Sequence, residues 1–163
     1  MSLSMSLLNW ALWGLVATLV LTTISSVAQG LRLTRMNIPF MLGTMFTPDR
    51  DRAKIYGFMV HLFNGWIFSF FYIAIFESLH YSSWWLGGIL GLFHALFVLT
   101  WGMRALPGLH PRMASELHGP TVARQLEPPG FLALNYGVRT PIAAFVSHLV
   151  FGIILGAFYR VLL

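Results

Sequence analysis

The chain has 163 residues, of which 57% are hydrophobic and 9% are charged, and its mean hydropathy is +0.73. Soluble domains contain about 45–50% apolar and about 25% charged residues, so this composition excludes an ordinary soluble protein and predicts an integral membrane protein. The length suits a single domain, residues 1–163, with about four membrane spans of roughly 20 residues each. It leaves no room for a separate catalytic domain. The chain has no Cys, which excludes disulfides and thiolate ligands.

Four apolar stretches are long enough to cross a bilayer as helices. They cover residues 7–31, 55–79, 84–103 and 141–163. The second and the fourth each follow a threonine N-cap and a proline, at Thr47 and Thr140. Short apolar pieces at 38–46 and 131–138 precede these two signals, and because they are too short to span, we expect them along the membrane interface. The proline-rich residues 104–130 are expected to form a loop.

The basic residues lie almost entirely in the two long connections between the spans, 32–54 and 104–139. The first connection contains Arg32, Arg35, Arg50, Arg52 and Lys54, and the second contains Arg104, Arg112, Arg124 and Arg139. By the positive-inside rule both connections are cytoplasmic, so both termini lie outside. A net charge of +5 would suggest nucleic-acid binding in a soluble protein, but these positions indicate orientation signals. The expected partner is the lipid bilayer and not nucleic acid.

The chain contains an internal repeat. Residues 55–72, IYGFMVHLFNGWIFSFFY, align without gaps with residues 142–159, IAAFVSHLVFGIILGAFY, and eight of the eighteen positions are identical. Apolar composition does not explain a His, a Gly and a Tyr in register. We therefore predict an all-α membrane fold made of two tandem helical hairpins, residues 7–79 and 84–163. Because each repeat has an even number of spans, the copies keep the same orientation and are related by a pseudo-twofold axis along the membrane normal.

Each aligned helix carries a stripe of one His, one Gly and one Tyr on a single face, at about 100° per residue. The members are His61, Gly65 and Tyr72 in the second span and His148, Gly152 and Tyr159 in the fourth. Gly87 and Gly91 give the third span a similar small-residue spacing. Because small residues let membrane helices approach closely, we expect these four glycines to make helix contacts, with the second and fourth spans meeting near Gly65 and Gly152. The two tyrosine hydroxyls are expected to anchor toward the outer leaflet.

His94 of the third span lies at about the same depth as His148, so we expect His61, His94 and His148 to converge at the repeat interface. An ionisable residue within a span is costly and tends to face the interior. Neutral imidazole binds transition metals such as Zn, Cu and Fe, and three His with an open fourth position form a known zinc site. The predicted function is a site that binds a transition metal or acts as a polar or proton relay. Asn64, carbonyls or water would orient the rings, because the only Glu of the spans, Glu77, lies far from them.

Several other functions fit the same sequence. The imidazoles could be hydrogen-bonded core residues, or axial ligands of haem or of a chlorophyll-type pigment, although closely crossing helices leave little space for a macrocycle. Parallel repeats also occur in small transporters, and the lack of carboxylates deep in the spans would limit the cargo to a small neutral or aromatic substrate, to protons carried by His, or to lipid. A structural or assembly subunit of a larger membrane complex, or a homo-oligomer, is a further alternative. The sequence has no hydrolase or phosphate-binding motif and assigns no enzyme activity.

Overall fold

The computed structural model describes residues 3–115 and 117–161, and their regular secondary structure is helical. Four of the described helices are long and apolar enough to cross a membrane. They cover Ser6–Gly30, Arg50–Leu79, Trp84–Leu109 and Thr140–Phe158. The prediction of an all-helical chain with four helices of membrane-spanning length is thus confirmed.

Shorter helical elements lie between or within these four helices. In chain order the elements are α1 (Leu3–Gly30), α2 (Ile38–Thr44), α3 (Arg50–Leu79), α4 (Trp84–Phe97), the π-helix η1 (Val98–Gly102), α5 (Met103–Leu109), the 3-10 helix η2 (Phe131–Tyr136) and α6 (Thr140–Phe158). The elements α4, η1 and α5 follow one another directly and together form the third long helix. The two short apolar pieces of the sequence correspond to α2 and η2.

Three predicted helix boundaries were wrong. The second long helix begins at Arg50, and its N-cap is Asp49 and not the predicted Thr47, because the side chain of Asp49 accepts a hydrogen bond from the Arg52 N–H at 2.8 Å. The third does not end at 103 but continues to Leu109, because η1 carries the helix forward and Pro107 lies inside its last segment. The helix of the fourth span ends at Phe158.

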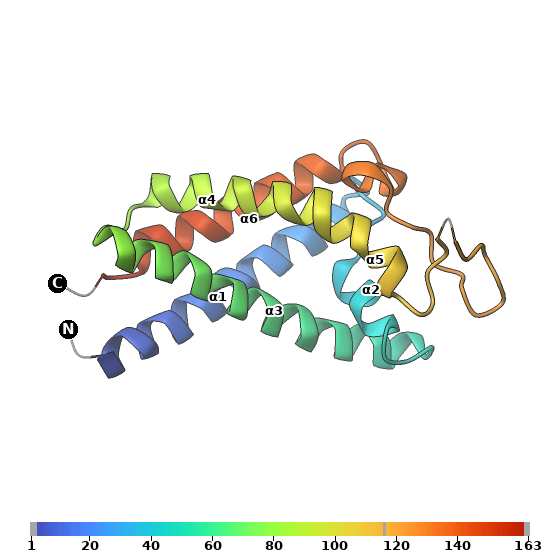
Figure 1. Ribbon diagram of the computed structural model, residues 1–163, viewed down its shortest axis with the longest axis horizontal. Coiled ribbons are helices and arrows are strands. Elements are labelled where there is room, and N and C mark those ends of the chain that lie inside the picture. Colours follow the sequence, from blue (N-terminus) through green and yellow to red (C-terminus); the bar gives the residue numbers. More distant parts are fainter. Residues whose placement is uncertain (1–2, 116, 162–163) are drawn as a thin grey trace.

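The helices form one elongated bundle with two different ends (Figure 1). The beginning of α1, the end of α6 and the turn between α3 and α4 lie at one end, which we call the terminal end. The helices α2 and α5 and the long connection before α6 lie at the other, the connection end. Helix α1 packs against both α3 and α6, and α4 runs along α6. The two segments that carry most of the basic residues therefore share one end of the molecule.

The predicted meeting of the second and fourth spans at Gly65 and Gly152 was wrong. Gly65 of α3 faces α1, where an added Cβ would lie 2.4 Å from Cγ2 of Thr18. Gly152 of α6 faces α4, where an added Cβ would lie 2.0 Å from the carbonyl oxygen of Gly87. Each glycine therefore brings together the two helices of its own predicted hairpin, and not the two hairpins. The repeat and its twofold axis stay predictions.

Glycine also brings α2 against the beginning of α3. An added Cβ on Gly43 would lie 1.7 Å from the carbonyl oxygen of Ala53, and one on Gly57 would lie 1.5 Å from that of Pro39. The side chain of Asn37 starts α2 by accepting a hydrogen bond from the Phe40 N–H at 2.9 Å. As a result, α2 covers the connection end of α3.

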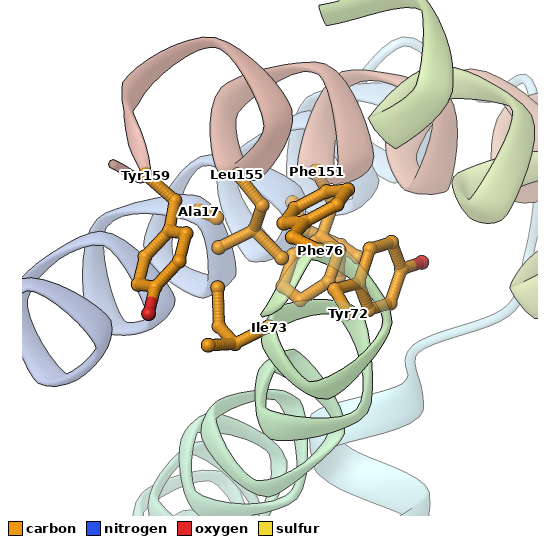
Figure 2. Close-up of a cluster of buried hydrophobic side chains, with 8 residues drawn as sticks. Ala17, Tyr72, Ile73, Phe76, Phe151, Leu155 and Tyr159 are labelled. Atoms are coloured by element: carbon orange, nitrogen blue, oxygen red, sulfur yellow. The ribbon is translucent and has the colours of Figure 1, made fainter. Parts of the chain in front are cut away.

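A core of buried apolar side chains fills the terminal half of the bundle (Figure 2). It contains Ala17 and Leu21 of α1, Tyr72, Ile73 and Phe76 of α3, and Phe151, Leu155 and Tyr159 at the end of α6. Phe76, Phe151 and Leu155 are fully buried. Leu21 and Phe151 also line a cavity that occupies the other half of the bundle, so the core forms the floor of this cavity.

Candidate functional site

All four long helices and α2 surround a cavity of about 270 Å³. His61, His94 and His148 all line it, although they come from α3, α4 and α6. The apolar part of its wall includes Phe68, Phe97, Val98 and Met103 and several smaller side chains. The structure thus brings the three histidines predicted from the sequence to one space inside the bundle.

The hydrogen bond of His61 fixes which of its ring nitrogens carries the proton. Its Nδ1 lies 3.0 Å from Oγ1 of Thr22 on α1, and the hydroxyl of Thr22 donates to the carbonyl of Thr18 at 2.7 Å. Because a hydroxyl has one hydrogen, Thr22 can only accept from the ring. The neutral ring of His61 therefore carries its proton on Nδ1 and leaves Nε2 as an acceptor.

His148 has the same tautomer for a different reason. Its Nδ1 lies 2.8 Å from the carbonyl oxygen of Ala144, one turn earlier on α6. A carbonyl oxygen can only accept, so Nδ1 donates, and Nε2 of the neutral ring is again an acceptor. His61 and His148, which occupy matching positions in the aligned segments, thus present the same chemical group.

His94 connects the ring of His148 to the core. Its Nδ1 lies 3.1 Å from the hydroxyl of Tyr72, which points away from the core cluster in Figure 2. The ring of His94 stacks on Phe68, with centroids 4.5 Å apart, and meets the ring of His148 edge-on at 4.8 Å. Among the three histidines, the ring contact in the described part of the chain is therefore between His94 and His148.

The second ring nitrogen of each histidine is open. In the described part of the chain no protein group bonds Nε2 of His61, His94 or His148, and the only fully buried side-chain nitrogen or oxygen without a partner is Oγ of Ser6. The three Nε2 atoms are therefore not sealed inside protein. Because all three residues line the cavity, this is the space from which Nε2 can be reached.

The cavity wall carries no formal charge. None of the described residues that line it is Asp, Glu, Lys or Arg. Besides the histidines, its polar side chains are Ser25, Ser26, Gln29, Thr34, Asn37, Asn64, Thr140 and Ser147. At the connection end, Asn37 donates to Gln29 at 2.9 Å and Thr34 bonds Thr140 at 2.6 Å. The wall thus offers neutral hydrogen-bonding groups on an apolar background.

The three histidines do not form the predicted metal centre. Within the described residues, no three His, Asp or Glu side chains are placed so that they could hold a metal ion. The reason lies in the arrangement of the rings, because the ring of His94 stacks on Phe68 and meets the ring of His148 edge-on. Coordination would require their nitrogens to converge on one point.

The remaining residues of the predicted site have separate roles. Asn64 lines the cavity. Tyr72 bonds His94, whereas Tyr159 donates to Glu77 at 2.5 Å in the terminal half, and the anchoring of the two hydroxyls toward the outer leaflet stays a prediction. Sequence reasoning missed Thr22, Phe68 and Phe97. The signal for Thr22 was present, since Thr18 and Thr22 place two hydroxyls one turn apart on an apolar helix.

The fold and the cavity define the class of protein only broadly, as an α-helical protein with four helices of membrane-spanning length around a neutral, histidine-lined cavity. The chain matches no protein-family model, no curated protein and no solved structure.

Proposed function

We propose that this is a four-span membrane protein that binds a small uncharged molecule in the cavity, with His61, His94 and His148 holding the polar part of the ligand. One observation carries the proposal: each of the three imidazoles lines the cavity, is anchored to the protein through Nδ1, and has an Nε2 that no described protein group bonds. Rings that are fixed in this way are preorganised, so binding a ligand costs little further ordering.

The neutral wall favours an uncharged ligand. An ion that left water for this cavity would meet no opposite charge among the described lining residues, and burial of an unpaired ion is costly. Apolar walls with a few placed polar groups are typical of small-molecule sites. A volume of about 270 Å³ is near the lower end of the usual range of about 300–1,000 Å³, which indicates a small ligand or one part of a larger one.

A proton relay through the same residues is a second candidate. The contact between the Tyr72 hydroxyl and Nδ1 of His94 at 3.1 Å, together with the ring contact between His94 and His148, supports it. A relay predicts proton flux into liposomes that contain the protein, and loss of this flux in Tyr72→Phe. Movement of a ligand across the membrane and attachment to a larger complex stay predictions from the sequence.

Binding of radiolabelled phenol to the protein in lipid nanodiscs tests the main proposal. Phenol is small and uncharged, and benzoate and benzylammonium provide charged probes of similar size. We expect saturable phenol binding above that of empty nanodiscs, and no saturable binding of either ion. Loss of one hydrogen bond in His148→Ala should weaken phenol binding by about two- to tenfold.

A pair of variants on α6 provides the matched control. Ala143 lines the cavity and Ala157 is exposed on the outside of the same helix. Ala143→Leu should reduce phenol binding because the larger side chain fills the space, and Ala157→Leu should leave it unchanged. Equal phenol binding by both variants, or binding no greater than that of empty nanodiscs, would show that the cavity is not a ligand site.

A further inference from the structure

One side of the cavity lies between two helices that are not packed closely together. Helix α1 packs on α3 and α6, and α4 packs on α6, but α3 and the third long helix have no comparable packing within the described residues. Side chains alone bridge them: Phe68 and Tyr72 of α3 reach His94. The cavity is nevertheless lined from both helices, by His61, Asn64 and Phe68 on one and by Phe97, Val98 and Gly102 on the other.

Aromatic side chains place this side of the cavity at the outer surface of the bundle. Phe97 lines the cavity and is also 51% exposed, and its ring lies 6.5 Å from that of Phe68 between centroids. The surface on both sides is apolar, with Phe93 and Trp101 exposed on the third helix and Phe71 exposed on α3. In a four-span protein this surface faces lipid. Phe68 and Phe97 therefore flank an opening toward the bilayer, which we call the side opening.

The π-helix η1 forms one wall of the side opening. It replaces regular α-helix over Val98–Gly102, and such segments occur often at functional sites. Gly102 adds no side chain, and a Cβ placed there would meet only Cγ1 of Val98, at 3.8 Å. The wall beside the opening thus leaves space that an ordinary helix with a larger residue would fill.

The connection end of the cavity, in contrast, is tied by hydrogen bonds. Asn37 bonds Gln29, and Thr34 bonds Thr140, at 2.9 and 2.6 Å, and these four side chains line the cavity. Helix α2, which packs on α3, covers the same end. A ligand dissolved in the bilayer therefore has a more open path than one dissolved in water.

The open nitrogens select a donor on the ligand. Nε2 of His61 and Nε2 of His148 are both acceptors, because their Nδ1 protons are held by Thr22 and Ala144. The uncharged group that donates most simply to an imidazole nitrogen is a hydroxyl. The cavity is too small for the whole of a long-chain ligand. It fits the polar end and the first part of the chain, while the rest of the chain stays in the bilayer.

Building on the proposed function, we infer that the ligand is a membrane lipid with an uncharged hydroxyl on a long apolar chain, which reaches the cavity sideways through the side opening at Phe68 and Phe97 and donates its hydroxyl to Nε2 of His61 or His148. This inference specifies the ligand class and its path for the same site. The inference about the ligand class and its path can be wrong while the proposed binding site is correct.

Photolabelling of the protein in nanodiscs tests the ligand class. The probe is hexadecanol with a diazirine near the hydroxyl, and the comparison probes are hexadecanoate and hexadecane with the diazirine at the same position. We expect the alcohol to label cavity peptides of α3 and α6, with competition by unlabelled hexadecanol, about two- to tenfold more strongly than the alkane because one hydrogen bond distinguishes them. Phenol binding without preferential labelling by the alcohol would overturn this inference but not the proposed function. Failure of both would overturn both.

Exchange kinetics test the path. The protein is loaded with the alcohol probe, chased with excess hexadecanol and illuminated at increasing times. Phe97→Trp should slow the exchange several-fold because it narrows the side opening, whereas Phe93→Trp, on the exposed face outside the cavity, should not. Slower exchange in Leu42→Trp, at the α2 side of the cavity, with normal exchange in Phe97→Trp would place the path at the connection end and overturn the sideways path.

Thr22 is a positioning residue, and its substitution should change the preference between two probes, which misfolding would not do. Thr22→Val removes the acceptor for Nδ1 of His61 and frees the ring to carry its proton on Nε2. We expect the preference for the alcohol over a diazirine-bearing 2-hexadecanone, which can only accept, to fall in Thr22→Val and to return in Thr22→Ser. An equal loss of labelling by both probes would overturn the assigned hydrogen-bond direction.

Discussion

His110 joins the start of the long connection to the end of α2. His110 is 3% exposed, and its Nδ1 accepts from the Arg112 N–H at 3.1 Å. Its Nε2 therefore carries the proton and donates to the Met41 carbonyl at 2.9 Å. Arg112 adds a bond to the carbonyl of Thr44 at 2.5 Å. The end of α2 and the start of the long connection are thus held together by a neutral imidazole with both nitrogens in use.

This bonding predicts a pH-dependent stability. Burial holds the pKa of His110 below its ordinary value of 6.5, and the nearby Arg112 guanidinium lowers the pKa further, against the opposing effect of the Met41 carbonyl. The unfolded chain therefore binds a proton more readily than the folded one, so the stabilisation by His110 is complete above pH 6.5 and is lost as the pH falls below it.

We expect the wild-type protein to lose stability below pH 6.5 relative to His110→Gln, by at most about 1.4 kcal/mol per pH unit, the limit for one proton. Thermal unfolding in detergent between pH 7.5 and 5 measures this difference. His118→Gln, at an exposed position of the same connection, should behave as wild type. Parallel pH profiles of wild type and His110→Gln would contradict the assigned bonding.

The sequence predicted which histidines share the site, but it did not predict how their rings are bonded. The convergence of His61, His94 and His148 was predictable, because an ionisable side chain within a span tends to face the interior and helix rise fixes relative depth. The hydrogen-bond partner of each ring nitrogen was not predictable. It depends on whether Nδ1 meets a hydroxyl, as in His61, or a carbonyl, as in His148, and spacing along the chain does not carry this information.

Glycine determines which helices lie close together. Along α4 and α6, added Cβ atoms on Gly87, Gly91, Gly152 and Gly156 would each lie within 2.2 Å of a backbone carbonyl oxygen of the other helix or of the residue just before it. Backbone atoms cannot move aside as a flexible side chain can. The two helices can therefore hold this distance only while these positions lack side chains.

Gly87→Ala should separate α4 from α6. The added Cβ would lie 2.0 Å from the Gly152 carbonyl oxygen, and such overpacking costs about 1–3 kcal/mol. For a chain of this size that corresponds to a fall in the midpoint of thermal unfolding of about 2–4 °C per kcal/mol. Thermal unfolding followed by circular dichroism measures it.

Gly108→Ala is the control, because it lies in the same long helix and an added Cβ there meets nothing within 4 Å. It should be neutral or slightly stabilising, since Ala is favoured over Gly in a helix. Similar midpoints for Gly87→Ala and Gly108→Ala would mean that α4 and α6 do not pack through Gly87.

At the element scale, small-residue spacing predicted close helix contacts but not the identity of the partners. Gly65 and Gly152 occupy matching places in the aligned segments, yet they face Thr18 and Gly87. A glycine marks where a neighbour can approach, and any helix with a complementary surface can be that neighbour. The continuation of the third helix past 103 was also missed. Pro107 suggested that the helix ends before it, but the structure places Pro107 inside α5.

The whole molecule is asymmetric along its length. Packed side chains fill the terminal half, whereas the cavity occupies the connection half. The helices α2 and α5 and the long connection lie at that end (Figure 1). Nine of the ten Lys and Arg residues belong to the two connections or the first turn and a half of α3. Since basic residues next to membrane spans are retained on the cytoplasmic side, the connection end is expected to be cytoplasmic. The cavity would then extend toward the inner leaflet from the side opening, because Phe68 and Phe97 lie near the middle of their helices.

Single-cysteine labelling determines this orientation without interference, because the natural chain contains no Cys. Ser78→Cys places a thiol at an exposed position near the end of α3, and Val122→Cys places one at a position that is 91% exposed in the long connection. A membrane-impermeant maleimide added to intact cells should label Ser78→Cys, and it should label Val122→Cys only after permeabilisation. The opposite pattern would show that the ten basic residues do not set the orientation and would place the cavity on the side of the outer leaflet. Labelling of both thiols from outside would mean that the four apolar helices do not all cross the membrane.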